Sequence, residues 1–95
     1  MKVSVRFFAV LKEIVGKREE NLNFNEQKVT VGMALKVLGK QYGKAFSEYV
    51  FDAKTGGVKS FLQLLVNGSS LPSDELKAEL HEGDILAILP PVGGG

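Results

Sequence analysis

The sequence contains no cysteine, one histidine, little net charge and no long hydrophobic run. The absence of cysteine excludes disulfide bonds, thiol nucleophiles and thiolate metal sites. A net charge of +1 supplies no long-range field, so we expect neither nucleic acid nor a membrane surface as a partner. No apolar run approaches the roughly 18 residues of a membrane span, and the first residues alternate instead of forming a signal-peptide core. We therefore expect a cytoplasmic protein.

Side chains that could carry catalysis or hold a metal are also scarce. His81 has no nucleophilic partner at a recognisable spacing, and its acidic neighbours are typical of a solvated surface. Glu75, Glu79 and Glu82 have helical spacing and are most simply surface charges, although such a set could in principle bind a divalent cation. The stretch Lys54–Gly57 lacks the spacing of a phosphate-binding loop. We therefore predict no catalytic side chains, no metal site and no bound cofactor.

The 95 residues, 44% hydrophobic and 24% charged, suit a single globular domain. Thr30 is a candidate N-cap for a helix whose apolar positions run from Val31 to Tyr42, with Gly43 just past its end. Alternating apolar and polar residues predict strands at residues 2–8, 20–24, 61–66 and 84–89. One main helix on one face of a mixed sheet of four to five strands is an α+β architecture.

The connections have weaker signals. Residues 9–16 are compatible with a short helical turn, and Asn67-Gly68 favours a tight turn between strands. Ser73 is a candidate N-cap for a second short helical turn that ends near Gly83. The glycine-bearing segment Asp52–Lys59 is typical of an exposed, mobile loop.

Strand parity predicts an apolar patch on the helix-free face of the sheet. If Leu64 and its alternate neighbours Leu62 and Val66 point toward the helix, Leu65 points outward. In the last strand, small Ala87 and the N-terminal Asp84 are easier to place on the open side, so we assign Leu86 and Ile88 to the inside. The outward apolar set is then Phe8, Leu65, Ile85 and Leu89. Such a patch usually marks a partner surface. Burial under loops, or a register shifted by one residue, is the alternative.

The last three residues, Gly93–Gly95, follow Pro90, Pro91 and Val92. We expect a domain over residues 1–91 and a flexible tail over residues 92–95. A terminal carboxylate has a pKa of about 3.3–3.7, so at neutral pH it is an anion and a poor electrophile. Another protein would have to activate it with ATP, and six residues from Pro90 reach at most about 20 Å. A frayed end without function is the alternative.

Several motifs together resemble one known family. They are Val5–Ala9, Leu11–Glu13, Gly16, Val66–Gly68, Glu82–Asp84 and the segment Pro90–Val92 before the glycines. This set is similar to the MoaD/ThiS-like sulfur carriers of the ubiquitin-like β-grasp class, especially the small subunit of molybdopterin synthase. The resemblance covers nearly the whole chain and implies a β-grasp fold.

The resemblance also implies a reaction and partners. A ubiquitin-activating-type, MoeB-like enzyme would adenylate Gly95 with ATP, and a sulfur donor would convert it to a thiocarboxylate, with Gly94 beside it. The tail would then enter a MoaE-like large subunit of molybdopterin synthase, where the sulfur passes to a precursor of the molybdenum or tungsten cofactor. The implied partner-binding residues are Phe8, Leu65, Ile85, Leu89, Pro90, Pro91, Val92 and Gly93, with Phe8 and Leu89 foremost.

Two departures leave alternatives open. Gly93 stands where the family usually has another residue, and the loop Asp52–Lys59 is longer than in the shortest members. Longer loops also occur among archaeal ubiquitin-like modifiers, so conjugation of Gly95 to target lysines is a second reading. A β-grasp interaction module without tail chemistry is a third.

Overall fold

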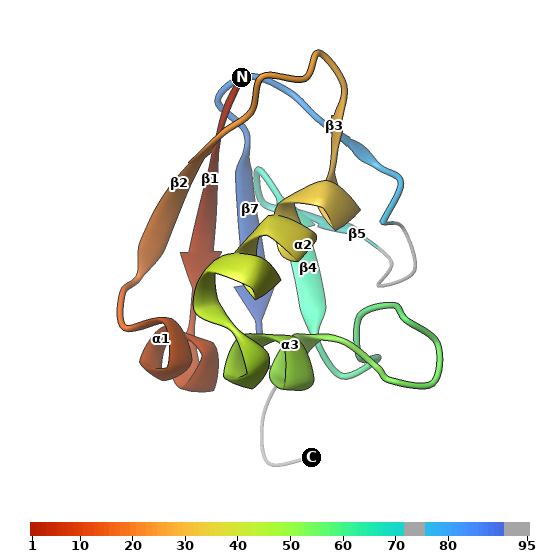
Figure 1. Cartoon of the computed structure of the whole chain (residues 1–95). Helices are drawn as coiled ribbons and strands as arrows, with labels where there is room; N and C mark the ends of the chain where they lie inside the picture. The colour runs from red at the N-terminus through yellow and green to blue at the C-terminus, as the bar shows by residue number, and fades with distance from the viewer. Residues whose placement is uncertain (72–75, 91–95) are drawn as a thin grey trace.

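The chain forms a five-stranded mixed sheet with its longest helix lying across one face (Figure 1). The structure is a computed structural model that describes residues 1–71 and 76–90. The strands of the sheet, in the order β2-β1-β7-β4-β5, are β1 (Lys2–Phe7), β2 (Glu19–Asn23), β4 (Gln63–Val66), β5 (Ser69–Leu71) and β7 (Ile85–Leu89). The helices are α1 (Ala9–Val15), α2 (Val31–Tyr42) and α3 (Lys44–Val50). The predicted α+β architecture is confirmed.

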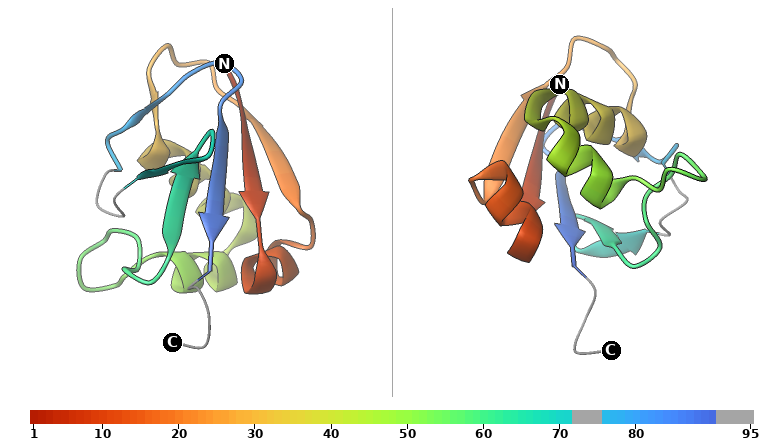
Figure 2. Two further views of the ribbon diagram at one scale, coloured as in Figure 1. Left: turned by 180° about the vertical axis from the view of Figure 1, so that it is seen from behind. Right: turned by 60° about the horizontal axis from the view of Figure 1, so that its bottom comes forward.

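The two strands farthest apart in the sequence are neighbours at the centre of the sheet. β1 pairs with β7 in parallel, with Val5 opposite Leu86 and Phe7 opposite Ile88. All other pairs in this sheet are antiparallel: β1 with β2, β7 with β4, and β4 with β5. The views in Figure 2 show α2 behind the sheet on the left, so that the other face carries no long helix.

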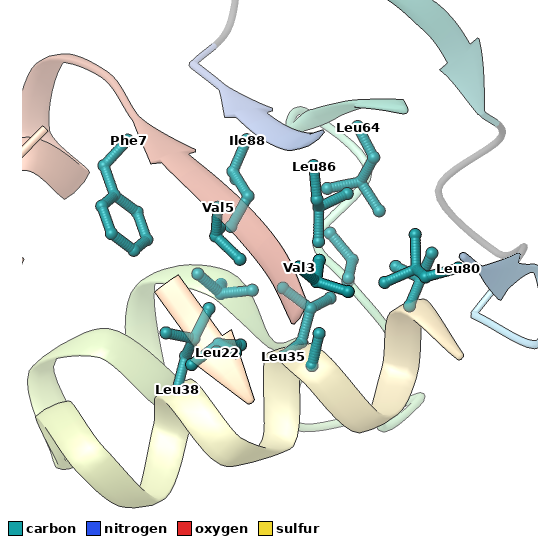
Figure 3. Packing of buried hydrophobic residues seen from close by; sticks show 14 of the residues in the cluster. Val3, Val5, Phe7, Leu22, Leu35, Leu38, Leu64, Leu80, Leu86 and Ile88 are labelled. Atoms are coloured by element: carbon teal, nitrogen blue, oxygen red, sulfur yellow. The ribbon is translucent and has the colours of Figure 1, made fainter. Parts of the chain in front are cut away.

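The hydrophobic core lies between α2 and the sheet, as Figure 3 shows. Leu35 and Leu38 of α2 are fully buried at helical spacing. The sheet supplies alternate side chains, which include Val3, Val5, Phe7, Leu64, Leu86 and Ile88, all almost completely buried. The predicted inward face of each of these strands is therefore confirmed. Burial of each such side chain stabilises the fold by roughly 1.5–3 kcal/mol before the entropy of folding is counted.

The ends of α2 follow the predicted signals. Thr30 accepts a hydrogen bond from the backbone nitrogen of Met33 at 3.2 Å, as an N-cap does. Gly43 ends the helix with φ of 82°, a conformation that favours glycine. Both predicted boundaries are confirmed.

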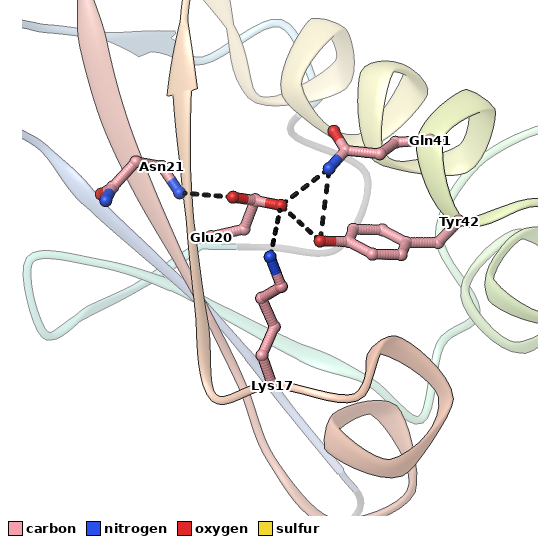
Figure 4. Close-up of polar contacts among 5 residues, drawn as sticks. All are labelled: Lys17, Glu20, Asn21, Gln41 and Tyr42. Atoms are coloured by element: carbon pink, nitrogen blue, oxygen red, sulfur yellow. Dashed lines mark hydrogen bonds and ion pairs between the residues drawn. The ribbon is translucent and has the colours of Figure 1, made fainter.

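A polar cluster ties the end of α2 to β2 (Figure 4). The Glu20 carboxylate accepts hydrogen bonds from the Tyr42 hydroxyl, from Gln41 at 2.7 Å and from Lys17 at 3.2 Å. The Tyr42 bond, supported by the other donors, holds the pKa of Glu20 below its ordinary value although burial opposes this. Burial and the adjacent carboxylate raise the pKa of Tyr42, so its hydroxyl stays a donor at neutral pH.

Helix α1 agrees with the predicted short turn, whereas α3 was not predicted. Only Phe46 and Val50 of α3 are buried. Phe46, Tyr49 and Val50 have helical spacing, but seven residues are too few for that period to stand out from a loop. Close contact with α2 is possible because Gly39 has no side chain: a Cβ there would lie 2.9 Å from the Ser47 hydroxyl. Packing therefore forms this helix where the local pattern is weak.

The predicted second helical turn is wrong over its later part. Its proposed cap, Ser73, lies outside the described residues. Glu79 and Leu80 form the short strand β6 (Glu79–Leu80), which pairs with β3 (Val29–Thr30). Leu80 is buried in the core, and this long-range pairing outweighs the local helical spacing.

The segment Asp52–Lys59 is not wholly exposed. Phe51 and Val58 form an isolated antiparallel bridge, and Asp52 donates its backbone N–H to the carbonyl of Gly57 at 2.7 Å. Val58 is buried, so the prediction of an exposed loop is wrong at this position. Residues 53–56, at the tip, are exposed as expected.

Candidate functional site

The helix-free face of the sheet carries an open groove of about 490 Å³, here called the outer groove. Its lining residues are Arg6, Phe8, Leu65, Asn67, Gly68, Ile85, Ala87 and Leu89. The four predicted outward apolar residues are all among them. Phe8 is 39% exposed, and the other three are half-buried. The structure thus brings together residues from the first strand, the fourth and the last.

Strand register explains this convergence. Ala87 of β7 lies opposite Arg6 on one side and opposite Leu65 on the other, so these residues form one row across three strands. Their sequence neighbours face the core, and successive side chains of a strand point to opposite faces. The small side chain of Ala87 leaves space between its two larger neighbours. The floor of the groove is therefore a direct consequence of alternation.

Phe8 reaches the groove because the chain turns sharply after β1. Phe8 is extended and forms the N-cap position of α1, and the next residue, Ala9, has φ of 52°. A left-handed conformation costs a residue other than glycine roughly 1–2 kcal/mol. Ala9 has this conformation at the point where the chain leaves the sheet, and the aromatic ring of the preceding Phe8 stays exposed.

One end of the groove is closed by a hydrogen-bonded turn. Asn67 and Gly68 both have positive φ, which confirms the predicted tight turn between β4 and β5. The Asn67 side chain donates to the Asp84 carboxylate at 2.9 Å and accepts from the backbone nitrogen of Ile85 at 2.9 Å. These bonds join the turn to the start of β7 and fix the position of Ile85.

Asp84 is the ionised centre of this arrangement. Its burial opposes ionisation, but hydrogen bonds from Asn67 and from the backbone of His81, with the nearby imidazole, hold the pKa of Asp84 below its ordinary value. From the sequence, Asn67 was predicted in a tight turn, His81 on a solvated surface and Asp84 at the start of a strand. Asn67 and Asp84 hold the turn against the start of β7 through a contact between residues 17 positions apart, and no local sequence pattern indicates such a contact.

A second open hollow of about 480 Å³ adjoins the groove and is here called the basic hollow. Its lining residues are Arg6, Phe7, Phe8, Lys12, Arg18 and Glu19. It therefore shares Arg6 and Phe8 with the outer groove. This cluster was not predicted from the sequence. Lys12 and Arg18 belong to the connection between β1 and β2, where no periodic pattern indicates which way a side chain points.

Strand β7 ends at the rim of the outer groove, which Leu89 lines. Leu89 ends β7 opposite Gln63, and half-buried Pro90 follows. Pro91, Val92 and Gly93–Gly95 lie outside the described residues, as does the predicted domain boundary after residue 91. Leu89, the last residue of β7, thus belongs to the groove that holds the predicted docking residues, three positions before the predicted tail at residues 92–95.

Residues 1–71 and 76–90 give little indication of a metal site, a histidine-based catalytic site or a membrane span. Within these ranges no three His, Cys, Asp or Glu residues lie close enough to hold a metal ion. The imidazole of His81 is largely exposed and lies 3.7 Å from the Asp84 carboxylate. None of the helices described is long and apolar enough to span a membrane.

Comparison with known proteins identifies relatives of two kinds. A sequence model of the ThiS family matches residues 5–95. The small archaeal modifier protein 3 of Haloferax volcanii is 31% identical over 96 residues, which covers all of both chains. A putative sulfur carrier protein of Archaeoglobus fulgidus is 29% identical over 76 residues, or 79% of this chain and 84% of the relative.

Solved structures give the same picture. The crystal structure of SAMP1 from Haloferax volcanii superimposes with a TM-score of 0.83 at 30% identity and covers all of both chains. A putative molybdopterin converting factor, subunit 1, from Pyrococcus furiosus has a TM-score of 0.76 at 26% identity, over 97% of this chain and 99% of the other. The expected ubiquitin-like β-grasp fold is confirmed.

Proposed function

Because the chain belongs to the ThiS family, we propose that it is a sulfur carrier whose Gly95 carboxylate is adenylated and then converted to a thiocarboxylate. The observation that supports this most directly is the extent of the family match, which continues through the glycines to residue 95. The relative from Archaeoglobus fulgidus is itself described as a putative sulfur carrier.

The chemistry needs no catalytic side chain on this protein. The carboxylate attacks the α-phosphorus of ATP, pyrophosphate leaves, and an acyl-adenylate forms. Hydrosulfide released from the donor then attacks the carbonyl carbon, AMP leaves, and loss of the S–H proton gives the thiocarboxylate. ATP is bound by the activating enzyme and the sulfur is supplied by a donor, so the carrier contributes the acyl group and the surface by which it is held. We place this reaction in the cytoplasm.

The outer groove is the proposed docking surface for a MoeB-like adenylating enzyme. Its exposed aromatic ring, Phe8, and its aliphatic walls offer apolar area that a partner would bury. Ordering a glycine tail in an enzyme channel costs on the order of 1 kcal/mol per residue. Apolar contacts at Leu89, a few residues before the predicted tail at residues 92–95, would offset this entropic cost and would leave the reactive terminus free.

Molybdopterin synthesis is the proposed destination of the sulfur. In this role the chain is the small subunit of molybdopterin synthase, and a MoaE-like large subunit receives the tail. The similar structure from Pyrococcus furiosus, described as a putative molybdopterin converting factor subunit, supports this choice. The resulting thiocarboxylate would contribute sulfur to the dithiolene of the cofactor.

Intact-protein mass spectrometry tests the proposal. The protein is incubated with the adenylating enzyme of its own genome, ATP and a sulfur donor, and we expect a mass gain that corresponds to one oxygen replaced by sulfur. Adding this product, the large subunit and the precursor should then yield molybdopterin. An unchanged mass with an enzyme that is active on another carrier would contradict sulfur carriage.

Variants of the tail locate the reactive group. Gly94→Leu, or one residue added after Gly95, should abolish thiocarboxylate formation while leaving the melting temperature unchanged, because a channel built for glycine excludes a Cβ. Ala53→Leu, at the exposed tip of a distant loop, is the matched control and should react normally. Normal sulfur loading of the extended variant would refute a role for Gly95.

Protein modification is a second candidate function, in which the activated Gly95 forms an isopeptide bond with target lysines. The full-length similarity to a small archaeal modifier protein favours it. Both functions share the adenylation step and differ in the nucleophile that follows. Conjugates whose tryptic peptides contain Gly95 joined to lysine would identify the modifier, and their absence in cells that make molybdopterin through this protein would favour the carrier.

A further inference from the structure

The basic hollow carries positive charge beside an apolar surface. Arg6, Lys12 and Arg18 line it together with one acidic residue, Glu19, so the lining has a net charge of +2. Glu19 lies 3.8 Å from the Nε atom of Arg6. Among residues 1–71 and 76–90, neither Lys12 nor Arg18 has an ion-pair partner within 4.0 Å. Two exposed cations therefore face the hollow without a counter-charge of their own.

Three structural features place these charges beside the proposed docking surface. Arg6 projects from β1 and lines both depressions, and Phe8 stands between them. Lys12 belongs to α1, which begins directly after Phe8. In Figure 1, α1 lies at the end of the sheet where β7 finishes, so the helix that carries Lys12 and the last residue of β7, Leu89, are at the same end of the molecule.

The chemistry of the two depressions indicates what would fill them. A free phosphate or a nucleic-acid backbone would use the cations of the hollow but leave the apolar groove empty. A protein surface that carries a carboxylate next to an aliphatic or aromatic side chain would use both. Opposite charges at the rim of an apolar contact accelerate association and fix the register of the two surfaces.

We propose that the basic hollow receives an acidic side chain of the adenylating enzyme while an apolar side chain of the same enzyme occupies the outer groove. This rests on the proposed function, because it assumes that such an enzyme binds this chain. Phe8 then separates the two contacts, and Lys12 and Arg18 orient the carrier so that its tail faces the ATP site.

Charge reversal tests the proposal. Binding of the full-length protein to the adenylating enzyme is measured by calorimetry for wild type, for Lys12→Glu with Arg18→Glu, and for Lys12→Arg with Arg18→Lys. The matched control is Lys36→Glu with Lys40→Glu, which changes the net charge equally but lies at exposed positions of α2, on the opposite face of the sheet. Melting temperatures verify that every variant is folded.

We expect the reversal at Lys12 and Arg18 to weaken binding at least about tenfold at about 50 mM NaCl, and by less than about threefold at about 500 mM, because salt screens exposed charges. The charge-preserving pair and the α2 control should remain within about twofold of wild type.

Two results would overturn the inference. Equal weakening by the α2 control would reveal a general charge effect, and unchanged binding of the reversed variant would show that the hollow is not used. In both cases the wild type still binds and gains sulfur, so the proposed function survives. If the wild type neither binds the enzyme nor gains sulfur, the proposed function fails and this inference fails with it.

Discussion

The two faces of the sheet are built by the same strands and have different tasks. On the face toward α2, Leu64, Leu86 and Ile88 are almost completely buried. On the other face, Leu65 and Leu89 are apolar as well, yet they remain half-exposed in the outer groove. Stability alone does not require apolar side chains there, because antiparallel sheets commonly carry polar residues on a solvated face.

The difference shows how a small domain separates folding from recognition. Neighbouring residues of one strand serve opposite faces, so a substitution can affect one task and leave the other nearly intact. The comparison is testable because Leu64 and Leu65 have the same side chain and adjacent positions.

The largest expected effect comes from the inner face. Leu64→Ala removes a fully buried side chain and should lower the free energy of unfolding by about 2–5 kcal/mol. Leu65→Ala should cost about 1 kcal/mol or less and instead weaken binding to the adenylating enzyme severalfold. Urea unfolding and calorimetry measure the two quantities. Similar destabilisation by both variants would abolish the distinction between the faces.

The next effect concerns binding. Phe8→Asp or Leu89→Asp places a charge in an apolar contact and should weaken binding to the adenylating enzyme about tenfold or more, which corresponds to about 1.4 kcal/mol. Val10→Asp is the control, since Val10 is 47% exposed and lines neither the outer groove nor the basic hollow. A large fall in melting temperature for Phe8→Asp would identify Phe8 as a core residue rather than a docking residue.

A smaller effect is expected where a polar turn supports the outer face. Asp84→Asn loses charge-assisted hydrogen bonds and should destabilise the fold by about 1–2 kcal/mol at neutral pH. Because the pKa of Asp84 is lowered on folding, its contribution is present above the unfolded value near 3.9 and is lost as pH falls through the folded value. The difference between wild type and variant should therefore shrink below about pH 4.

Unfolding curves measured across acidic pH check this expectation. Glu13→Gln is the control, because it removes an exposed carboxylate on α1 that is far from the Asn67 turn in the sequence. A variant at Asp84 whose deficit stays constant down to about pH 2 would show that the carboxylate charge contributes nothing.

The smallest effect is expected on the helix side of the sheet. Tyr42→Phe removes the hydroxyl that Glu20 accepts from, while Gln41 and Lys17 remain as donors. We expect a loss of about 1 kcal/mol in the free energy of unfolding and no change in enzyme binding. NMR titration should show the pKa of Glu20 closer to its ordinary value. Weaker enzyme binding would mean that the faces are coupled.

Much of the fold was predictable because its signals are local. Thr30 and Gly43 mark the two ends of α2 as expected, and Asn67-Gly68 forms the tight turn. The missed elements are short. The helix α3 is too short, at seven residues, for its apolar spacing to stand out, and β6 has a helix-like charge spacing that pairing with β3 overrides. Local propensity predicts the structure of such short segments poorly, because contacts with distant parts of the chain hold the two residues of β6 and the seven residues of α3 in place.

The candidate site was predictable in one respect and not in another. Alternation, together with the choice of the open side for small Ala87, assigned Phe8, Leu65, Ile85 and Leu89 to one face, and the structure assembles these four residues into one groove. The basic hollow and the Asn67–Asp84 contact were not predictable, because each depends on segments that meet only after the chain has folded back on itself.

The period-two strands, the capped helix and the tight turn follow from residues that are close together along the chain, and the absence of thiol chemistry follows from composition. The insertion of β7 between β1 and β4, with Ala87 opposite both Arg6 and Leu65, depends on the folded chain as a whole. Long-range pairing is selected by the burial of the whole core at once, and no short segment contains that information. This insertion places Leu89, the last residue of β7, in the outer groove, which adjoins the basic hollow.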